Sequence, residues 1–588
     1  MNGITECFVH NYPIADLLAR MGRLLEIKGE NVFKVRAYEK AAENIRACSE
    51  DLEMLRREGR LNEVGGLGKA LQEKIGEFID TGRVSAYDRL TEEIPESVLE
   101  MVDIPSVGPK KAKLFFERLK LHSLDDLERA ARAGKLAGLP GIQAKTITNI
   151  LKGIETVRSG QERMNLGTAL ESADVFVRSL KKLKQVKAIE VAGSLRRMKE
   201  QIRDIDILIV ADNPQPVMEA FVRHPEVKQI NAYGSTKSSV LTQEHVQVDL
   251  RVVEENSFGA ALLYFTGSKN FNIKLRQLAA TRKQRVNEYG IFALKRKSEK
   301  RLAGRTEKEC FDVLGLPFIP PELREDLGEK RLFGPGRPQI PRLVQLKDVR
   351  GDGHVHSRWS DGENSIAELV QAARQRSYDY IVISDHSVSL RIAQGLPAAE
   401  VEKKKKEINS LNRRQKNVRI LFGAEVEIDK QGCLDYNERI LKAFDLVIGA
   451  VHSGFEIGRE SMTRRLVAAC RHPYVDVIAH PLCRHIGKRD FLDVDFDLIC
   501  RTAAETGTLL EINAFPVRLD LDSAHVYFAK TQGVRFMINT DAHQIKHLDF
   551  MQLGVGLARR GWLTKNDVVN TYPLSGFNKC LKRNQNKS

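Results

Sequence analysis

The chain has 588 residues, of which 42% are hydrophobic and 29% are charged. This hydrophobic content excludes a disordered chain. Because the chain is too long for a single hydrophobic core, we expect several folded domains. Its formal net charge of +15 favours a polyanionic partner, because basic groups that neutralise phosphates release condensed counterions. The eight cysteines show no C-x-x-C spacing, which argues against a zinc ribbon or disulfide framework. No apolar run could form the core of a signal peptide or span a membrane, so we expect a cytoplasmic protein.

The first 158 residues predict short helices separated by glycine-containing turns. We divide them into a small helical domain over 1–90 and a fingers-like helical domain over 91–158. The turns "VGGLGKA" and "IPSVGPKKA" each open a helix after a glycine, which directs backbone N–H groups at a phosphate. Candidate DNA-backbone contacts are therefore Gly66, Gly68, Gly108 and Lys110. An ordinary helix–helix turn is the alternative at each place.

Residues 159–256 predict strands and helices of a mixed α/β domain. Asp204 and Asp206 stand two apart in "DIDILIV", so both side chains project from one face of the strand. Asp249 lies in "VQVDLRVV", which predicts a neighbouring buried strand. Three converging carboxylates are what two Mg²⁺ ions require, whereas acidic residues at strand ends that only face solvent are the alternative.

Upstream of these aspartates, the motif "GSLRR" offers groups for a phosphate. Gly193 and Ser194 are placed to donate hydrogen bonds, and Arg197 to clamp the anion. A mixed helical segment follows at 257–323. The stretch 324–348, with its charges, glycines and prolines, is typical of an interdomain linker.

Seven apolar runs between residues 349 and 575 alternate with helical patterns, and a polar residue closes each run. The runs are "GHVHS", "IVISDHS", "ILFGAEVEI", "LVIGAVHS", "VDVIAHP", "LLEINAF" and "FMINTDAH". Parallel α/β barrels carry their active sites at the carboxyl ends of the strands. We therefore predict a barrel with metal ligands at its mouth.

Nine residues in these runs and the turn after the first are candidate metal ligands: His354, His356, Asp361, His386, Glu425, His452, His480, Asp541 and His543. Imidazoles and carboxylates without thiolates suit Mn²⁺, Zn²⁺ or Fe²⁺ better than Mg²⁺ alone. Nine ligands imply two or three ions, bridged by Glu425. The usual chemistry of such a cluster is phosphoester hydrolysis by a metal-activated water.

Four motifs stand out in the front half: "AGSLRRMKEQIRDIDILIV", "VDLRV", "YFTGSKNFNIKLR" and "NEYGIF". Together they resemble the palm and thumb of family X DNA polymerases, the group that includes DNA polymerase beta. The resemblance implies nucleotidyl transfer with Mg²⁺ or Mn²⁺ held by Asp204, Asp206 and Asp249. It implies nucleotide contacts by Gly193, Ser194, Arg197, Tyr264, Phe265, Thr266, Gly267 and Asn272, and a template contact by Arg276.

The segments "FKVRAYEKAAENI" and "GGLGKALQEKI" resemble the same family's small helical domain, which grips a 5′-phosphate across a gap. By position, Lys40 corresponds to a phosphate ligand. Lys74 corresponds to the amine that some members use as a Schiff-base nucleophile to remove a deoxyribose phosphate. We prefer the simpler interpretation of Lys74 as a DNA-binding lysine.

The motifs "HVHSRWSDG", "SDHS", "AHP" and "NTDAH" resemble the PHP (polymerase and histidinol phosphatase) phosphoesterases, whose fold is a distorted seven-stranded βα barrel. The resemblance places the nine ligands at the family's metal positions. Arg484, Asn513 and Arg518 are candidate contacts for the substrate phosphates. For these three, a turn residue or a surface charge is the alternative.

We therefore expect a multidomain protein: an all-α helix-hairpin-helix region, an α+β nucleotidyltransferase palm with a thumb, and a barrel over 349–575 followed by a basic tail over 576–588. The expected function is gap-filling DNA repair synthesis coupled to a 3′→5′ exonuclease or phosphodiesterase, with cutting of abasic sites as a further candidate activity. Expected partners are gapped or nicked DNA and deoxynucleoside triphosphates, with no membrane, and we expect a monomer. The alternatives are a barrel that is only a structural metal-binding module, a palm that is only a DNA clamp, and a small-molecule phosphatase.

Overall fold

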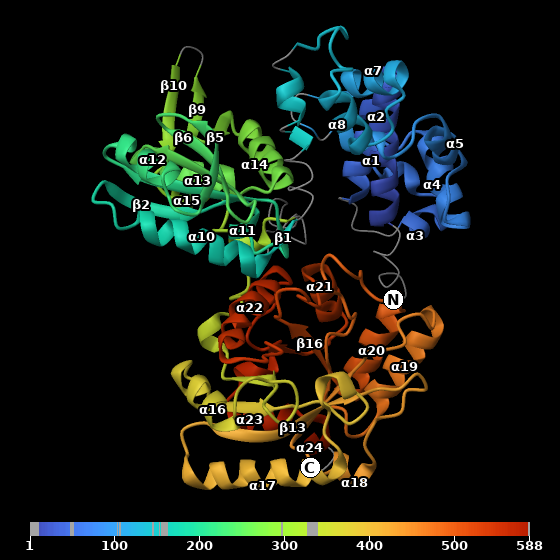
Figure 1. Ribbon diagram of the computed structural model, residues 1–588, viewed down its shortest axis with the longest axis vertical. Helices are drawn as coiled ribbons and strands as arrows, with labels where there is room; N and C mark the ends of the chain where they lie inside the picture. The colour runs from blue at the N-terminus through green and yellow to red at the C-terminus, as the bar shows by residue number, and fades with distance from the viewer. Residues whose placement is uncertain are drawn as a thin grey trace. The chain divides into compact units, whose positions relative to one another are not determined.

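Figure 1 shows a computed structural model of the chain, which describes residues 11–46, 52–102, 104, 107–143, 146–151, 153–154, 163–295, 298–325 and 339–585. The chain forms two compact units, Met1–Glu162 and Arg163–Ser588. The predicted domain boundary after residue 158 lies close to this division. Within the described ranges, no helix is long and apolar enough to cross a membrane.

In the described part of the first unit, every regular element is a helix. Its helices bury one apolar face each in a common core that includes Leu24, Ile45, Ile75 and Phe115. The elements are α1 (Asn11–Lys28), α2 (Val32–Arg46), α3 (Leu52–Arg57), η1 (Leu61–Glu63), α4 (Lys69–Thr81), α5 (Ser85–Glu93), α6 (Val98–Val102), α7 (Pro109–Leu119) and α8 (Leu124–Arg132).

Glycines shape the two turns that open α4 and α7. Gly66 has a φ of +84°, a conformation that L side chains rarely adopt, and the Asn44 side chain donates a hydrogen bond to the carbonyl oxygen of Gly65. Gly68 and Gly108 are the extended N-cap residues of α4 and α7, and neither has a side chain that could cap the helix. The N–H groups of Lys69 and Ala70 in α4 and of Lys110 in α7, where Pro109 has none, therefore have no side-chain cap.

The second unit begins with a five-stranded mixed sheet in the order β2-β4-β7-β6-β5, in which only β4 and β7 run parallel. Ile205, Ile207 and Ile209 of β4 are fully buried, and this alternation puts Asp204 and Asp206 on the opposite face. The elements are β1 (Met164–Asn165), α10 (Leu166–Leu180), β2 (Val186–Val191), α11 (Gly193–Arg196), β3 (Gln201–Ile202), β4 (Asp204–Ala211), α12 (Pro214–Val222), β5 (Val227–Tyr233), β6 (Lys237–Thr242) and β7 (Gln247–Val253).

A helical segment and a three-stranded antiparallel sheet in the order β10-β9-β8 follow the palm sheet. The elements are η2 (Glu255–Ser257), α13 (Phe258–Thr266), α14 (Lys269–Thr281), β8 (Gln284–Asn287), β9 (Gly290–Lys295), β10 (Ser298–Ala303), α15 (Glu307–Val313) and η3 (Pro321–Leu323). Glu307 of α15 forms ion pairs of 2.7 Å with Arg196 of α11 and with the fully buried Arg324. The salt bridges join the palm to this segment, so Arg324 belongs to its core, although we predicted it at the start of a linker.

Most of the predicted linker, residues 326–338, lies outside the described residues. Its last part packs on the C-terminal domain, because Val344 is buried and its N–H donates to the carbonyl oxygen of Leu563 at 2.9 Å. Leu343 also forms a bridge with Thr564. Residues 343–344 are therefore held against the barrel rather than free.

Seven parallel strands form the C-terminal domain in the unbroken order β11 to β17. Helices such as α16, α17, α19 and α20 surround them (Figure 1). The strands are β11 (Gly351–Val355), β12 (Tyr380–Ile383), β13 (Arg419–Glu427), β14 (Leu446–Ala450), β15 (Val477–Ile478), β16 (Leu509–Asn513) and β17 (Phe536–Asn539). A parallel bridge between Val355 and Ala542 connects the two edges and nearly closes the barrel. The predicted fold class is confirmed, and the ligand-bearing strand ends lie at one mouth.

Helices of this domain cover the barrel, and short 3₁₀ turns occur between them. They are η5 (Leu346–Asp348), α16 (Ile366–Gln375), η6 (Arg391–Ala393), α17 (Ala398–Arg414), α18 (Glu438–Leu441), α19 (Arg459–Arg471), α20 (Phe496–Thr506), α21 (Ser523–Thr531), η7 (Ile545–Phe550), α22 (Met551–Arg560), η8 (Val569–Thr571), α23 (Leu574–Cys580) and α24 (Lys582–Gln585). Most of α23 and all of α24 fall in the predicted basic tail over 576–588. Phe577 and Leu581 are buried there, and Lys582 donates to the Cys470 and His472 carbonyl oxygens, so the tail is packed through residue 582.

The palm and the barrel share a hydrophobic core within the second unit. A side chain at Gly556 of α22 would lie 2.6 Å from Met198 of the palm, so the glycine permits this close packing. Arg560, also on α22, donates to the carbonyl oxygen of Arg197 at 3.0 Å and lies 3.8 Å from the Glu200 carboxylate. The barrel therefore reaches the predicted phosphate motif of the palm.

Candidate functional site

The structure brings all nine predicted metal ligands together at the carboxyl ends of the barrel strands. Potential ligand atoms lie within 4.8 Å of one another in each of three overlapping groups: His356, Asp361, His386 and His543; His354, His356 and Asp541; His386, Glu425 and His452. His480 lies outside these groups, but its ring is 5.1 Å from that of His452. The strand-end pattern in the sequence therefore predicted this cluster.

Glu425 of β13 lies at the centre of the cluster and is almost fully buried. Its carboxylate oxygens approach five imidazoles: His386 Nδ1 at 2.8 Å, His480 Nε2 at 3.2 Å, His354 Nε2 at 3.3 Å, His452 Nε2 at 3.4 Å and His356 Nε2 at 3.6 Å. A carboxylate with this surrounding is suited to bridge two ions.

The other two acids complete the cluster on either side of Glu425. Asp541 lies 3.2 Å from His356 Nε2, and Asp361 lies 3.4 Å from His543 Nε2 and 3.6 Å from His386 Nε2. Burial raises the pKa of both aspartates, but the neighbouring imidazoles bring it far below its usual range. Both aspartates are therefore held as carboxylates.

Several buried polar atoms of the cluster have no hydrogen-bond partner within the described part of the chain: His354 Nε2, both ring nitrogens of His356, and Glu425 Oε2. A buried polar atom without a partner is costly, so a cluster of them requires a ligand. Nitrogen and oxygen donors in this number fit divalent cations such as Mn²⁺, Zn²⁺ or Fe²⁺. The residues therefore fit the metal centre that their spacing predicts.

Burial and the neighbouring charges shift the pKa values of the cluster imidazoles in opposite directions. Burial alone would lower the pKa of His386, but the Glu425 and Asp361 carboxylates raise it to about 10. The pKa of His356 falls to about 4, because burial and then the neighbouring His386 and His543 disfavour its charge. Cations that bind here must replace protons, so metal binding should tighten as the pH rises.

Two carboxylates that the sequence did not reveal orient the ligands. Glu511 of β16 is buried and accepts hydrogen bonds from His354 Nδ1 at 2.8 Å and from the Asn539 amide at 2.8 Å. Glu427 of β13 accepts from His452 Nδ1 at 2.8 Å. These bonds leave each Nε2 as the metal-binding nitrogen. A signal for them was present in the sequence, because Glu427 stands two residues after Glu425 and Glu511 stands two residues before Asn513, so each shares a strand face with a polar residue.

Lys404 of α17 is fully buried, although it lies in a lysine run that suggests a solvated helix face. Its ammonium contacts Asp385 at 2.8 Å and donates to the carbonyl oxygens of Ile383 and Gly423. Asp385 in turn accepts the Ser357 N–H at 2.6 Å. The lysine thus supports the turn that follows His356.

The three residues predicted to contact a substrate phosphate behave differently. The guanidinium of Arg484 donates to the carbonyl oxygens of Arg518 and Leu519, so it supports a loop. The amide of Asn513 donates to Asp541 at 3.1 Å and to Glu511 at 3.0 Å. Only Arg518 keeps its terminal nitrogens free of hydrogen bonds within the described chain, with Nε 3.5 Å from Asp541. Arg518 therefore stays a candidate phosphate contact, whereas the side chains of the other two are bound within the chain.

The three palm aspartates lie side by side on neighbouring strands, since Asp206 of β4 is in register with Asp249 of β7. Asp249 accepts hydrogen bonds from Ser239 at 2.5 Å and from Gln247 at 3.0 Å. Burial, followed by the charges of Asp204 and Asp249, raises the pKa of Asp206 to about 7. An acid that is difficult to ionise beside two others is expected at a site that binds cations.

The start of α11 brings the predicted phosphate motif to these aspartates. Gly193 has a φ of +64°, and a side chain there would clash with the Asp206 carboxylate, so the close approach requires glycine. Ser194 follows in α11 and is partly exposed. The motif and the acids therefore form one site.

Arg197 does not face solvent as a free phosphate ligand. It is 9% exposed, its Nε donates to the Glu325 carboxylate at 2.5 Å, and another nitrogen donates to the Thr266 carbonyl oxygen. Glu325 also approaches Arg560 of the barrel at 3.5 Å. The guanidinium of Arg197, the predicted phosphate clamp, is therefore already paired with a carboxylate that is distant in the sequence.

The other predicted nucleotide contacts lie where α13 meets α14. Thr266 is buried and its hydroxyl accepts from Arg196, while Gly267 ends α13 with a φ of +66°. Asn272 donates to the Tyr264 carbonyl oxygen at 2.7 Å, and Arg251 lies over the Phe265 ring at 4.4 Å. Arg276 is exposed on α14. The side chains of Thr266 and Asn272 are thus engaged internally.

In the first unit, the predicted DNA contacts lie around the two glycine turns. Lys40 is exposed on α2, and a side chain at Gly66 would come within 3.6 Å of it. Lys74 is partly exposed on α4, with its ammonium 3.1 Å from the Ala70 carbonyl oxygen. Lys110 is exposed in the first turn of α7, after Gly108. Each lysine is available to an external anion.

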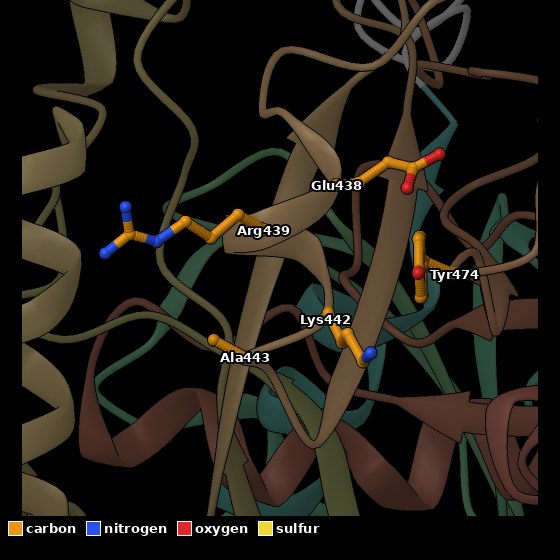
Figure 2. Close-up of a pocket in the computed structure, with 5 residues that line it drawn as sticks. All are labelled: Glu438, Arg439, Lys442, Ala443 and Tyr474. Carbon is orange, nitrogen blue, oxygen red and sulfur yellow. The ribbon is translucent and has the colours of Figure 1, made fainter.

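A pocket of about 420 Å³ lies away from these sites (Figure 2). Glu438, Arg439, Lys442, Ala443 and Tyr474 line it. These residues precede β14 and β15, so the pocket is at the amino ends of the strands, opposite the ligand cluster. In barrels of this kind, that end contributes to stability rather than to chemistry.

Four family models match the chain. They are a helix-hairpin-helix domain over residues 9–84, a SAM-like helix-hairpin-helix tandem over 98–156, a DNA polymerase beta thumb over 261–325 and a PHP domain over 352–507. The matches follow the predicted order of domains.

Curated relatives cover the whole chain or parts of it. A Bacillus subtilis (strain 168) protein named DNA polymerase/3′-5′ exonuclease PolX is 37% identical over 578 residues, which is 98% of this chain and 100% of the relative. DNA polymerase lambda of Rattus norvegicus is 24% identical over 345 residues, 54% of this chain and 56% of the relative. A probable phosphatase of Thermoanaerobacter sp. (strain X514) is 27% identical over 231 residues, 37% of this chain and 89% of the relative.

The Glu511–His354 hydrogen bond can be tested by Glu511→Gln. Because the carboxylate makes His354 a better donor to a metal, we expect the affinity for Mn²⁺ to fall about 10- to 100-fold. Calorimetric titration with Mn²⁺ measures this change. Glu505→Gln, an exposed acid on α20, is the matched control, and unchanged Mn²⁺ affinity in Glu511→Gln would contradict the orienting role.

Proposed function

Because the chain belongs to the PolX family of DNA polymerase/3′-5′ exonucleases, we propose that it fills short gaps in DNA at the palm site and shortens or repairs DNA 3′ ends at the barrel site. The observation that carries this proposal is the presence of two separate sets of metal-type ligands in one chain. Three aspartates lie on the palm sheet, and nine histidines and acids lie at the barrel mouth. Each set suits one of the two reactions.

At the palm, divalent ions supply charge neutralisation for the nucleotide phosphates and activation of the primer hydroxyl when they are bound. We propose Mg²⁺ or Mn²⁺ for this site, held by Asp204, Asp206 and Asp249. The backbone at Gly193 and the hydroxyl of Ser194 adjoin these acids and would hold the triphosphate. The raised pKa of Asp206 supports this role, because a bound cation would offset both the burial and the repulsion by Asp204 and Asp249 that raise it.

At the barrel, two or three Mn²⁺, Zn²⁺ or Fe²⁺ ions would supply Lewis-acid stabilisation of the phosphate and activation of water. The chain contributes a shared carboxylate in Glu425, fixed imidazoles through Glu511 and Glu427, and a cation in Arg518 for the phosphate oxygens. The unpartnered buried nitrogens support bound cations at this mouth.

The helix-hairpin-helix turns would hold gapped or nicked DNA through its backbone. Gly66, Gly68, Gly108, Lys40 and Lys110 are the proposed contacts, and Arg276 would touch the template strand. Lys74 serves DNA binding in this proposal and is also the candidate lyase nucleophile. We expect a monomer that acts in the cytoplasm on DNA and deoxynucleoside triphosphates.

Two double variants separate the proposed activities on one gapped duplex with Mn²⁺. We expect Asp204→Ala with Asp206→Ala to abolish primer extension and to retain end shortening, because only the palm ligands are removed. We expect the reverse for His354→Ala with His356→Ala. Gel analysis of the labelled primer measures both. Primer degradation at the wild-type rate in the histidine variant would contradict the nuclease assignment, and loss of both activities in either variant would show that the sites are not independent.

The Arg197–Glu325 pair predicts an effect on nucleotide affinity. If Arg197 binds the triphosphate, the nucleotide must displace Glu325, so Glu325→Gln should lower KM for the incoming nucleotide about 3- to 10-fold. Steady-state gap filling measures this. Glu322→Gln is the control, because Glu322 pairs with Arg559 at 2.6 Å. A raised or unchanged KM in Glu325→Gln would contradict the competition.

A further inference from the structure

An aromatic cluster borders the metal ligands at the barrel mouth. Phe515 follows β16, and its ring centroid lies 6.3 Å from that of the ligand His543. His547 and Phe550 of η7 stack on each other at 5.0 Å, and both meet Phe515 edge to face, at 5.1 and 5.5 Å. Phe515 and His547 are partly exposed. An apolar ring therefore reaches solvent directly beside the reacting centre.

The loop that carries Phe515 is fixed from several sides. The Phe515 N–H donates to Asn513 Oδ1 at 3.0 Å, and the Phe515 carbonyl oxygen accepts the N–H groups of Arg518 and Leu519 at 2.8 and 2.9 Å. On the palm side, a side chain at Gly167 would lie 3.0 Å from Pro516. The ring is thus held in place before any substrate arrives, which reduces the entropy cost of binding.

Phe515 and Arg518 lie on one short turn beside the same ligands. Arg518 directs Nε to Asp541, whereas Phe515 approaches His543, so a phosphate contact and an apolar ring flank one part of the metal cluster. Every ring contact of Phe515 with a described residue is perpendicular, and no described aromatic ring stacks parallel to it. A ligand that carries both a phosphate and a flat ring could bind Arg518 through the phosphate and stack its ring on Phe515.

We propose that Phe515, backed by His547 and Phe550, is the platform on which the base of the 3′-terminal nucleotide stacks while Arg518 and the metal ligands engage its phosphate. The inference rests on the proposed exonuclease function and deepens it, because it names a nucleotide as the group that the barrel selects. Stacking on an aromatic face is tolerant of sequence, since every base has such a face. The site would thus remove any nucleotide but prefer an end that carries a base.

The test compares two primers that differ only at the 3′ end, one with dA and one with an abasic tetrahydrofuran residue. Wild-type full-length protein with Mn²⁺ should show a higher kcat/KM on the dA end. Phe515→Ala should lower kcat/KM on the dA end about 5- to 150-fold, the range of base–aromatic stacking. The ratio of the two rates should then approach one. Phe528→Ala, a partly buried ring on α21, should keep the wild-type ratio.

Phe515→Leu keeps apolar volume against Phe550 without a flat ring, so it should lose the same preference, whereas Phe515→Tyr should retain it. Calorimetry gives a second measure: dAMP should bind the Mn²⁺-loaded wild type more tightly than deoxyribose 5-phosphate, and equally tightly in Phe515→Leu. An equal decrease on both primers, or an unchanged ratio in Phe515→Leu, would overturn the platform. A wild type that shortens neither primer would instead refute the exonuclease function itself.

Discussion

The buried carboxylate of Glu425 is the constraint on which the C-terminal domain depends. Five imidazoles approach it within 3.6 Å, and Asp541 and Asp361 flank them, yet Glu425 Oε2 and several imidazole nitrogens have no hydrogen-bond partner among the described residues. Such a set is unfavourable unless cations occupy it. The parallel barrel makes the set attainable, because it brings seven strand ends to one mouth and leaves room there for their side chains.

The palm also holds acidic groups close together where a bound cation would stabilise them. Asp206 is held beside Asp204 and Asp249, and burial, followed by the charges of these two neighbours, raises its pKa to about 7. The two sites lie in one compact unit. Arg560 of the barrel donates to the backbone carbonyl oxygen of Arg197 and also lies near Glu325, the carboxylate that pairs with the Arg197 guanidinium. The barrel therefore supports the phosphate motif of the palm as well as its own ligands.

Features with a local pattern could be predicted from the sequence. The alternation in β4 placed Asp204 and Asp206 on one face, and the strand ends identified nine residues that the structure brings together, because both depend on neighbours in the chain. Roles that depend on distant partners could not be predicted. Arg484 supports a loop because of where residues 518–519 lie, and Arg197 is occupied because Glu325 reaches it.

The most direct test of the metal-centre account is anomalous diffraction at the manganese edge from crystals of the full chain grown with Mn²⁺. The account predicts two or three peaks at the barrel mouth, each bounded by members of the nine-residue set and at least two of them sharing Glu425. No peak at the mouth, or a single ion that does not contact Glu425, would contradict it.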